Sequence, residues 1–234
     1  MPLCYAEGMS MRRIAFAYGE YFHIYNRGNS KQDIFKDSSD KDRFQSLLFL
    51  ANGTSPFVYR EVEKDGVYEF DHGEQLVHIG AYCLMPNHFH ILLTPAVEDG
   101  IKTFMQKLST GYSMYFNKKN ERTGVLFEGK FKAQHVDSDE YLKYLFSYIH
   151  LNPVKLIQAD WKEAGIRNLE KVKQYLDLYK YSSLNDYFMS REEGCIIQPT
   201  KFPEYFRNKT EIDKELLGWL AYREFENGAQ THPT

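Results

Sequence analysis

Two strand-length apolar runs separated by a short turn constrain the fold of this chain more than any other feature. Residues 75–84 and 88–93 are rich in apolar side chains, and Met85-Pro86-Asn87 lies between them. Proline and asparagine favour tight turns, and so short a connection joins strands that are antiparallel neighbours. The sequence therefore predicts a β-hairpin over residues 75–93.

The segment before this hairpin begins with a strand pattern and continues with a helix pattern. Residues 20–26 alternate bulky and polar types and end at a turn over residues 27–29, which predicts a first strand. A helix should follow, capped within residues 37–40 and ending near Gly53, because its apolar side chains recur at helical spacing. Residues 55–74 are highly charged, and we expect a surface hairpin there, with short strands at 59–62 and 67–70.

The segment after the hairpin repeats the change from helix to strand. Residues 101–117 carry apolar side chains with a 3.6-residue period, which predicts a long amphipathic helix. Residues 124–136 are typical of a loop leading into a strand. Ser138 or Asp139 can cap a last helix that Pro153 ends.

The resulting order, β-α-β-β-α-β-α, predicts an α+β fold. It fits a ferredoxin-like (RRM-like) four-stranded antiparallel sheet with helices packed on it. We expect one domain over residues 14–187. A C-terminal extension over residues 188–234, whose role the sequence does not assign, should form a small helical tail with one helix at 211–225.

Composition narrows the class of protein. No run of eighteen apolar residues occurs, and residues 1–13 lack the apolar stretch of a signal peptide, so we expect a soluble cytoplasmic protein without a membrane partner. Cys4, Cys83 and Cys195 show no CxxC spacing, which fits a reducing compartment better than disulfides or a thiolate zinc site.

Charge gives a weak indication of nucleic-acid binding. The net charge is −3, from 29 basic and 32 acidic residues, so the chain as a whole is not basic. Residues 101–135 hold seven Lys or Arg against two Glu, a local excess of +5. This stretch is either a solvated helix face with a charged loop or a DNA-binding patch. The 18 Tyr and 17 Phe could fill a core or stack on bases.

The pattern His88-Phe89-His90 is the first candidate for chemistry. Side chains alternate along a strand, so both imidazoles share one face and could bind one divalent metal. Such a pair could hold zinc in a hydrolase, or Mg²⁺ or Mn²⁺ with an oxygen ligand and a phosphate. It could also only satisfy polar contacts.

Tyr148 and Asn152 lie four residues apart on the last predicted helix and should project from one face. Tyr148 could be a nucleophile and Asn152 an oxygen ligand. Against this, Tyr141, Tyr144 and Tyr148 form an aromatic stripe of the kind that usually packs in a core. Pro153 also disfavours helical backbone at Asn152, so the spacing argument is approximate there.

These residue types together fit the breaking of a phosphodiester bond. A metal ion on a non-bridging oxygen would neutralise charge and orient the phosphorus for attack by the tyrosine hydroxyl. The products would be a phosphotyrosine and a free 3′-hydroxyl, so the strand could be rejoined without a nucleotide triphosphate.

Four stretches of the sequence resemble one known family, the single-tyrosine HUH transposases (IS200-like transposases), and most closely the branch associated with repetitive extragenic palindromes (REP). These stretches, in the order of the family, are YFHIYNRGNSKQDIF (21–35), AYCLMPNHFHILL (81–93), GVLFEGKFKA (124–133) and YLKYLFSYIHLNPVK (141–155). The resemblance covers residues 21–187. Residues 53–78 form a longer segment than the family pattern needs, and the chain after residue 187 matches none of it.

The resemblance implies residue roles and a substrate. His88 and His90 would bind Mg²⁺ or Mn²⁺, Tyr148 would be the nucleophile, and Asn152 would be the accessory ligand. The substrate would be single-stranded DNA with a hairpin or palindromic repeat. Tyr112 and Tyr115 are rival nucleophiles, but neither has an asparagine four residues later.

Other choices stay open in the sequence. Arg27, Lys130 and Lys132 are our candidates for phosphate contacts, although each could be an ordinary solvated charge. The competing functions are a catalytically silent module that binds single-stranded nucleic acid and a zinc-dependent hydrolase. A lone tyrosine must act twice or be duplicated by symmetry, so a monomer and a homodimer both fit.

Overall fold

The computed structural model describes residues 15–205 and 208–221, and its centre is an antiparallel sheet of four strands in the order β2-β3-β1-β4. The strands are β1 (Tyr21–Arg27), β2 (Val77–Met85), β3 (His88–Pro95) and β4 (Lys132–Val136). The sheet order and the alternation with helices confirm the predicted α+β, ferredoxin-like fold. The predicted hairpin is also confirmed, because β2 and β3 pair across a turn at Pro86-Asn87.

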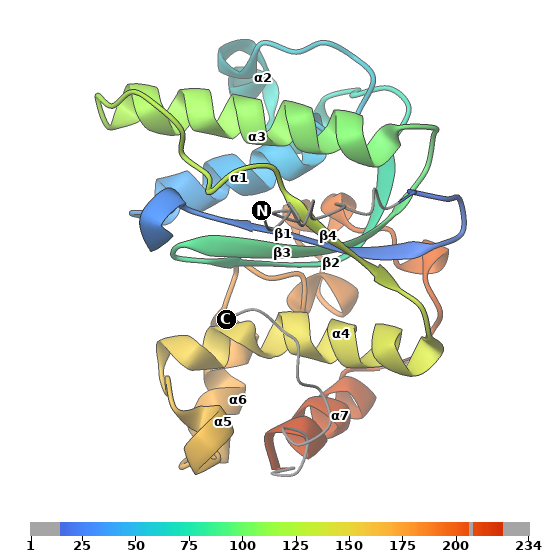
Figure 1. Ribbon diagram of the computed structural model, residues 1–234. Coiled ribbons are helices and arrows are strands. Elements are labelled where there is room, and N and C mark those ends of the chain that lie inside the picture. Colours follow the sequence, from blue (N-terminus) through green and yellow to red (C-terminus); the bar gives the residue numbers. More distant parts are fainter. Residues whose placement is uncertain (1–14, 206–207, 222–234) are drawn as a thin grey trace, which may run out of the picture.

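Helices cover both faces of the sheet (Figure 1). One face carries α1 (Ser38–Leu50) and α3 (Gly100–Lys119), and the other carries α4 (Asp139–Leu151), α5 (Trp161–Ala164), α6 (Leu169–Leu178) and α7 (Lys209–Ala221). Two of the predicted caps are observed. Asp37 accepts a hydrogen bond from the Asp40 amide at the start of α1, and Ser138 accepts one from the Tyr141 amide at the start of α4.

Strand alternation gives the two faces of the sheet different chemistry. Ile24 on β1 pairs with Ile91 on β3, and both are fully buried among side chains of α1 and α3. The next pair along these strands, Tyr25 and His90, points to the opposite face, which α4 covers. The main core therefore lies between the sheet and α1 and α3, while histidine and tyrosine side chains gather beneath α4.

The predicted surface hairpin at 55–74 is wrong. The structure has helix α2 (Tyr59–Asp65) and a 3-10 turn, η2 (Val67–Glu69), in its place. Only Val62 is buried in α2, and Glu, Lys and Arg, which are good helix formers, fill most of its other positions. Gly66, with a φ of 98°, ends the helix. The charged sequence has no two-residue alternation that would have stabilised strands.

The chain after α6 runs along the outer edge of β2. The Gln198 amide donates to the carbonyl of Ile79 at 2.8 Å, and Ser182 forms a bridge with Cys83. The short turns here are η4 (Asn185–Tyr187), η5 (Glu192–Ile196) and η6 (Pro199–Lys201). Gly80 allows close approach, since a Cβ there would meet the Phe202 ring at 2.7 Å. Part of the predicted extension therefore packs against the sheet.

The sequence also made predictions about a C-terminal helix, the cysteines and membrane-spanning segments. The helix predicted at 211–225 is observed as α7, and its residues after 221 lie outside the described part of the chain, as do residues 1–13 and Cys4. Cys83 is buried and Cys195 exposed, and both are free thiols. Among the described residues, no helix combines the length and apolar character needed to span a membrane.

Candidate active site

His88 and His90 lie side by side on β3, on the sheet face beneath α4. Their ring centroids are 5.1 Å apart, with the rings nearly perpendicular. His90 is buried and His88 is half-buried, and both line one pocket. The structure thus places the predicted pair on a single face, as strand alternation requires.

Both imidazoles are held through the same ring nitrogen. His88 Nδ1 lies 2.6 Å from Asn87 Oδ1, and His90 Nδ1 lies 2.8 Å from His23 Nε2. Neither contact uses the Nε2 atom of His88 or His90. This is the arrangement found around metal-binding histidines, in which one nitrogen is anchored and the other is the ligand.

The pocket keeps these imidazoles neutral. Burial, helped by the charges of Lys155 and Arg27, lowers the pKa of His88 to about 4. Burial also holds the pKa of His90 well below its usual range, with further contributions from His23, His88 and Lys155. Metal binding needs the neutral imidazole, so the two side chains already have the protonation state of ligands near neutral pH.

Tyr148 reaches the histidines from α4. Its ring meets the His90 ring edge-on, with centroids 5.5 Å apart, and the His23 ring at 6.3 Å. Burial is the main cause that raises its pKa, and the nearby Tyr144 adds to the rise, whereas the Asn152 side chain opposes it. The stripe of Tyr141, Tyr144 and Tyr148 lines the pocket, so it is not simple core packing.

Asn152 remains helical in spite of Pro153. Its backbone has φ −52° and ψ −40°, and its side-chain nitrogen donates to the Tyr148 carbonyl at 2.9 Å. Its Oδ1 is buried without a hydrogen-bond partner. This orphaned acceptor fits an accessory ligand, although Asn152 is not among the residues that line the pocket.

The pocket has a volume of about 300 Å³ and a cationic lining. Its basic residues are Arg27, Lys31, Lys132 and Lys155, and no Asp or Glu of the described chain lines it. Glu128, outside the lining, forms an ion pair with Arg27. Partial burial is the main cause that lowers the pKa of Lys155. A pocket of this charge favours an anionic ligand, even though the whole chain is slightly acidic.

The candidate phosphate contacts divide into two groups. Arg27 and Lys132 line the pocket, and the Lys132 ammonium lies 6.0 Å from the centre of the Tyr25 ring. Lys130 is exposed just before β4 and does not line the pocket. The structure therefore brings only Arg27 and Lys132 to the histidines and Tyr148.

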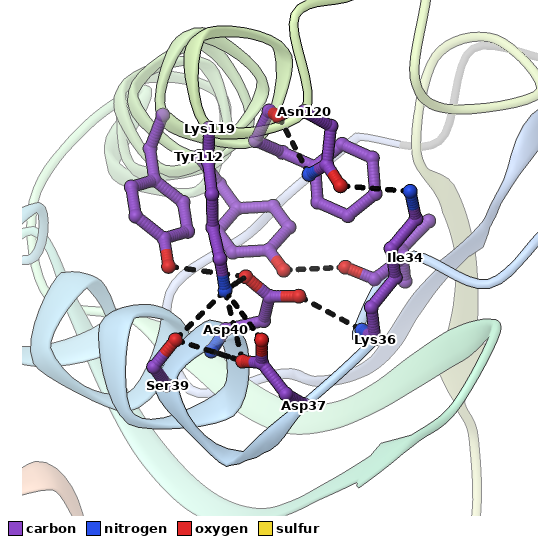
Figure 2. Close-up of polar contacts among 10 residues, drawn as sticks. Ile34, Lys36, Asp37, Ser39, Asp40, Tyr112, Lys119 and Asn120 are labelled. Carbon is purple, nitrogen blue, oxygen red and sulfur yellow. Dashed lines mark hydrogen bonds and ion pairs between the residues drawn. The ribbon is translucent and has the colours of Figure 1, made fainter.

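The two rival tyrosines lie on the other side of the sheet. Tyr112, on α3, is fully buried and donates its hydroxyl hydrogen bond to the Ile34 carbonyl. Tyr115 donates to Asp40 at 3.0 Å, within the cluster that joins α3 to α1 (Figure 2). Neither hydroxyl shares a cavity with His88 and His90, so neither is placed to act with them.

Several residues of the pocket received no role from the sequence, among them His23, Lys31 and Lys155. The sequence signal for His23 is the clearest of these. His23 lies two residues from both Tyr21 and Tyr25 on β1, and side chains two residues apart on a strand share one face. Lys31 follows the turn at residues 27–29, and Lys155 follows the end of α4. Residue spacing does not predict the direction of a side chain at such positions. No group of three or more His, Cys, Asp or Glu in the described chain is arranged to hold a metal.

Comparison with known protein families agrees with the motifs in the centre of the chain. Residues 69–152 match the family described as "Transposase IS200 like", and this stretch contains His88, His90, Tyr148 and Asn152. The match covers the stretches 81–93 and 124–133 and residues 141–152 of the last stretch, and it confirms the family resemblance over that part of the chain. Among curated proteins, none matches the chain.

Two solved structures are similar to this chain at low identity. One is a REP-associated tyrosine transposase bound to a REP hairpin, with 16% identity and a TM-score of 0.44, covering 75% of this chain and 82% of that one. The other is the crystal structure of a candidate transposase from Deinococcus radiodurans R1, with 16% identity and a TM-score of 0.33, covering 59% of this chain and 95% of that one.

Proposed function

We propose that this chain, which carries an IS200-like transposase region over residues 69–152, cleaves and rejoins single-stranded DNA through a covalent phosphotyrosine. Tyr148 is the nucleophile, and His88, His90 and Asn152 hold Mg²⁺ or Mn²⁺. The substrate contains a hairpin or palindromic repeat, as the family resemblance implies.

One observation carries this proposal. Tyr148 from α4 and the histidine pair from β3 meet in a pocket whose lining, within the described chain, is cationic and free of carboxylates. A nucleophilic hydroxyl beside neutral imidazoles and a cationic lining suits attack on a phosphodiester. The donor set also fits a metal, because the two imidazoles leave Nε2 unused in their anchoring contacts and the buried Asn152 Oδ1 lacks a partner.

The reaction breaks one bond and makes one. Tyr148 Oη bonds to phosphorus, the bond from phosphorus to the 3′-oxygen breaks, and that oxygen takes up the proton that the phenol loses. Lys132 and Lys155 would contact the phosphate oxygens, and the exposed faces of Tyr25 and Tyr144 would hold adjacent bases. The metal, when bound, would polarise the phosphate oxygens. Attack by a second 3′-hydroxyl reverses the sequence and rejoins the strand.

A covalent adduct tests the nucleophile. The full chain is incubated with Mn²⁺ and labelled single-stranded hairpin DNA, and the products are separated on a denaturing gel. We expect an adduct with the native chain and none with Tyr148→Phe, which keeps the ring but lacks the hydroxyl. Tyr115→Phe is the matched control, since it removes a hydroxyl on the far face of the sheet, and it should keep the adduct.

Other outcomes would support a different nucleophile or a different function. An adduct that persists in Tyr148→Phe would exclude this residue and direct attention to Tyr144, one turn earlier in the same pocket. Tight DNA binding without an adduct across a broad set of hairpins would support a silent binding module. Zinc-dependent turnover of small esters that is unchanged in Tyr148→Phe would support a hydrolase.

A further inference from the structure

His23 lies in the candidate active site although it belongs to neither the histidine pair nor the tyrosine helix. It is 6% exposed, on the central strand β1, between the fully buried Phe22 and Ile24. Its Nε2 lies 2.8 Å from Nδ1 of His90, which is 67 residues away in the sequence. The contact is a buried hydrogen bond between two imidazoles. Such a bond constrains the orientation of both rings.

The surroundings of His23 fix its ring on two sides. Its ring lies beside that of His90, with centroids 5.0 Å apart and planes 25° apart. Tyr25 packs on it at 4.9 Å, and Tyr148 meets it edge-on at 6.3 Å. The ring is held between these neighbours. It therefore presents Nε2 to His90 in a constant direction.

The direction of the proton in this bond follows from the role of His90. A neutral imidazole has one N–H donor and one acceptor nitrogen. If Nε2 of His90 is to offer its lone pair to a metal, the proton must reside on Nδ1, and His23 Nε2 must accept it. Asn87 Oδ1 does the same for His88 from 2.6 Å. The two histidines of the pair are thus anchored by different residues, His88 by Asn87 of the turn before β3 and His90 by His23 of β1.

We infer that His23 is a positioning residue that holds His90 in the metal-binding tautomer and orientation. The inference deepens the proposed function and rests on it, because it concerns the same metal site. Partners of this kind commonly affect metal affinity by roughly 10- to 100-fold. In this role His23 acts through His90 and does not itself touch the metal.

Two substitutions separate the hydrogen bond from ring packing. His23→Phe keeps an aromatic ring between Tyr25 and His90 but has no acceptor nitrogen. His23→Gln places an amide near the position of Nε2 and keeps an acceptor. His135→Gln is the matched control, because His135 lies on the adjacent strand β4 of the same sheet, is exposed, and pairs with Glu20 outside the pocket.

Mn²⁺ affinity of the full chain, measured by electron paramagnetic resonance of the free ion, is the primary readout. We expect His23→Phe to bind Mn²⁺ roughly 10- to 100-fold more weakly, His23→Gln to recover most of the loss, and His135→Gln to match the native chain. Unchanged affinity in His23→Phe would overturn the inference, as would equal losses in His23→Phe and His23→Gln. A native chain that binds no Mn²⁺ would instead overturn the proposed metal site.

A second measurement does not depend on the stability of any variant. Nitrogen-15 NMR of the metal-free native chain reports which ring nitrogen of His90 carries the proton. We expect the proton on Nδ1. A proton on Nε2 of His90 would contradict the inference even if every His23 variant failed to fold.

Discussion

Burial keeps the His88 and His150 side chains uncharged near neutral pH. Burial lowers the pKa of His88 to about 4 and that of His150 to about 3. The two residues use this neutrality differently. His88 faces the pocket, whereas His150 is fully buried and its Nε2 contacts the Ser183 hydroxyl at 2.8 Å, which joins α4 to the chain after α6. Burial thus keeps a proposed metal ligand neutral in one place and a structural histidine neutral in another.

His150 should make the stability of the protein depend on pH. Its folded pKa of about 3 lies below the unfolded value of 6.5, so its stabilising contribution is complete above pH 6.5 and is lost as the pH falls through 6.5 toward 3. Between pH 7.5 and pH 5 the loss is about 2 kcal/mol. Urea unfolding should show that the free energy of unfolding falls about this much more for the native chain than for His150→Gln, which cannot become charged.

The comparison with His150→Gln isolates this residue from the other histidines, since His88 and His90 titrate in both proteins. Glutamine can keep a hydrogen bond to Ser183, so the variant should fold. The same pH dependence in both proteins would show that His150 remains uncharged for a reason other than burial in the folded state.

Pairs of helices are joined by polar clusters as well as by apolar packing. The start of α1 and the end of α3 meet around Asp40, whose side chain is fully buried (Figure 2). Its carboxylate accepts hydrogen bonds from the Lys119 ammonium at 2.7 Å, the Tyr115 hydroxyl at 3.0 Å and the Lys36 amide at 2.8 Å. Lys119 also pairs with Asp37, the N-cap of α1. This cluster fixes the two helices that cover the apolar face of the sheet.

Removal of the central carboxylate should therefore destabilise the fold. Asp40→Ala leaves three buried or partly buried donors without their acceptor, and we expect the free energy of unfolding to fall by about 3 kcal/mol. Asp42→Ala is the matched control on the same helix, because the Asp42–Lys180 pair is half exposed, and its loss should be within about 1 kcal/mol. Chemical denaturation measures both. Equal effects of the two substitutions would contradict a structural role for the cluster.

At the scale of the whole molecule, the segment after α6 covers the β2 edge of the sheet. An uncovered edge strand offers unpaired backbone groups to other molecules. Here the segment after α6 bonds to β2, and Ile196 and Ile197 of this segment are buried in the core. Farther on, α7 packs on α4, with an ion pair between Lys143 and Glu215 at 3.1 Å. The sheet and the C-terminal segment therefore pack as one structure.

Truncation tests this arrangement. A chain that ends at Tyr187 loses the burial of Ile196 and Ile197, which contributes about 3 to 6 kcal/mol. We expect its melting temperature to lie on the order of 10 °C below that of a chain that ends at Tyr205. Sedimentation should also show self-association only for the shorter chain, through the bared edge of β2. Equal melting and equal sedimentation of the two would show that residues 188–205 do not stabilise the sheet.

Local patterns in the sequence determined most of the helices and strands, and they identified the histidine pair and Tyr148 of the candidate site. Alternation along a strand puts His88 and His90 on one face, and capping residues set the start of α1 and α4, because these effects act over a few residues. The segment 55–74 was predicted wrongly because its charged side chains carry little periodic signal and one buried valine decides its packing.

Only the tertiary structure brought distant residues to the pocket. His23 meets His90 across 67 residues because β1 and β3 pair in one register, and no local pattern specifies that register. The same holds for Lys155 beside the histidines and for Tyr112 and Tyr115 on the opposite face. The sequence by itself named a histidine pair and a tyrosine, and long-range packing decided which other side chains surround them and what charge the pocket has.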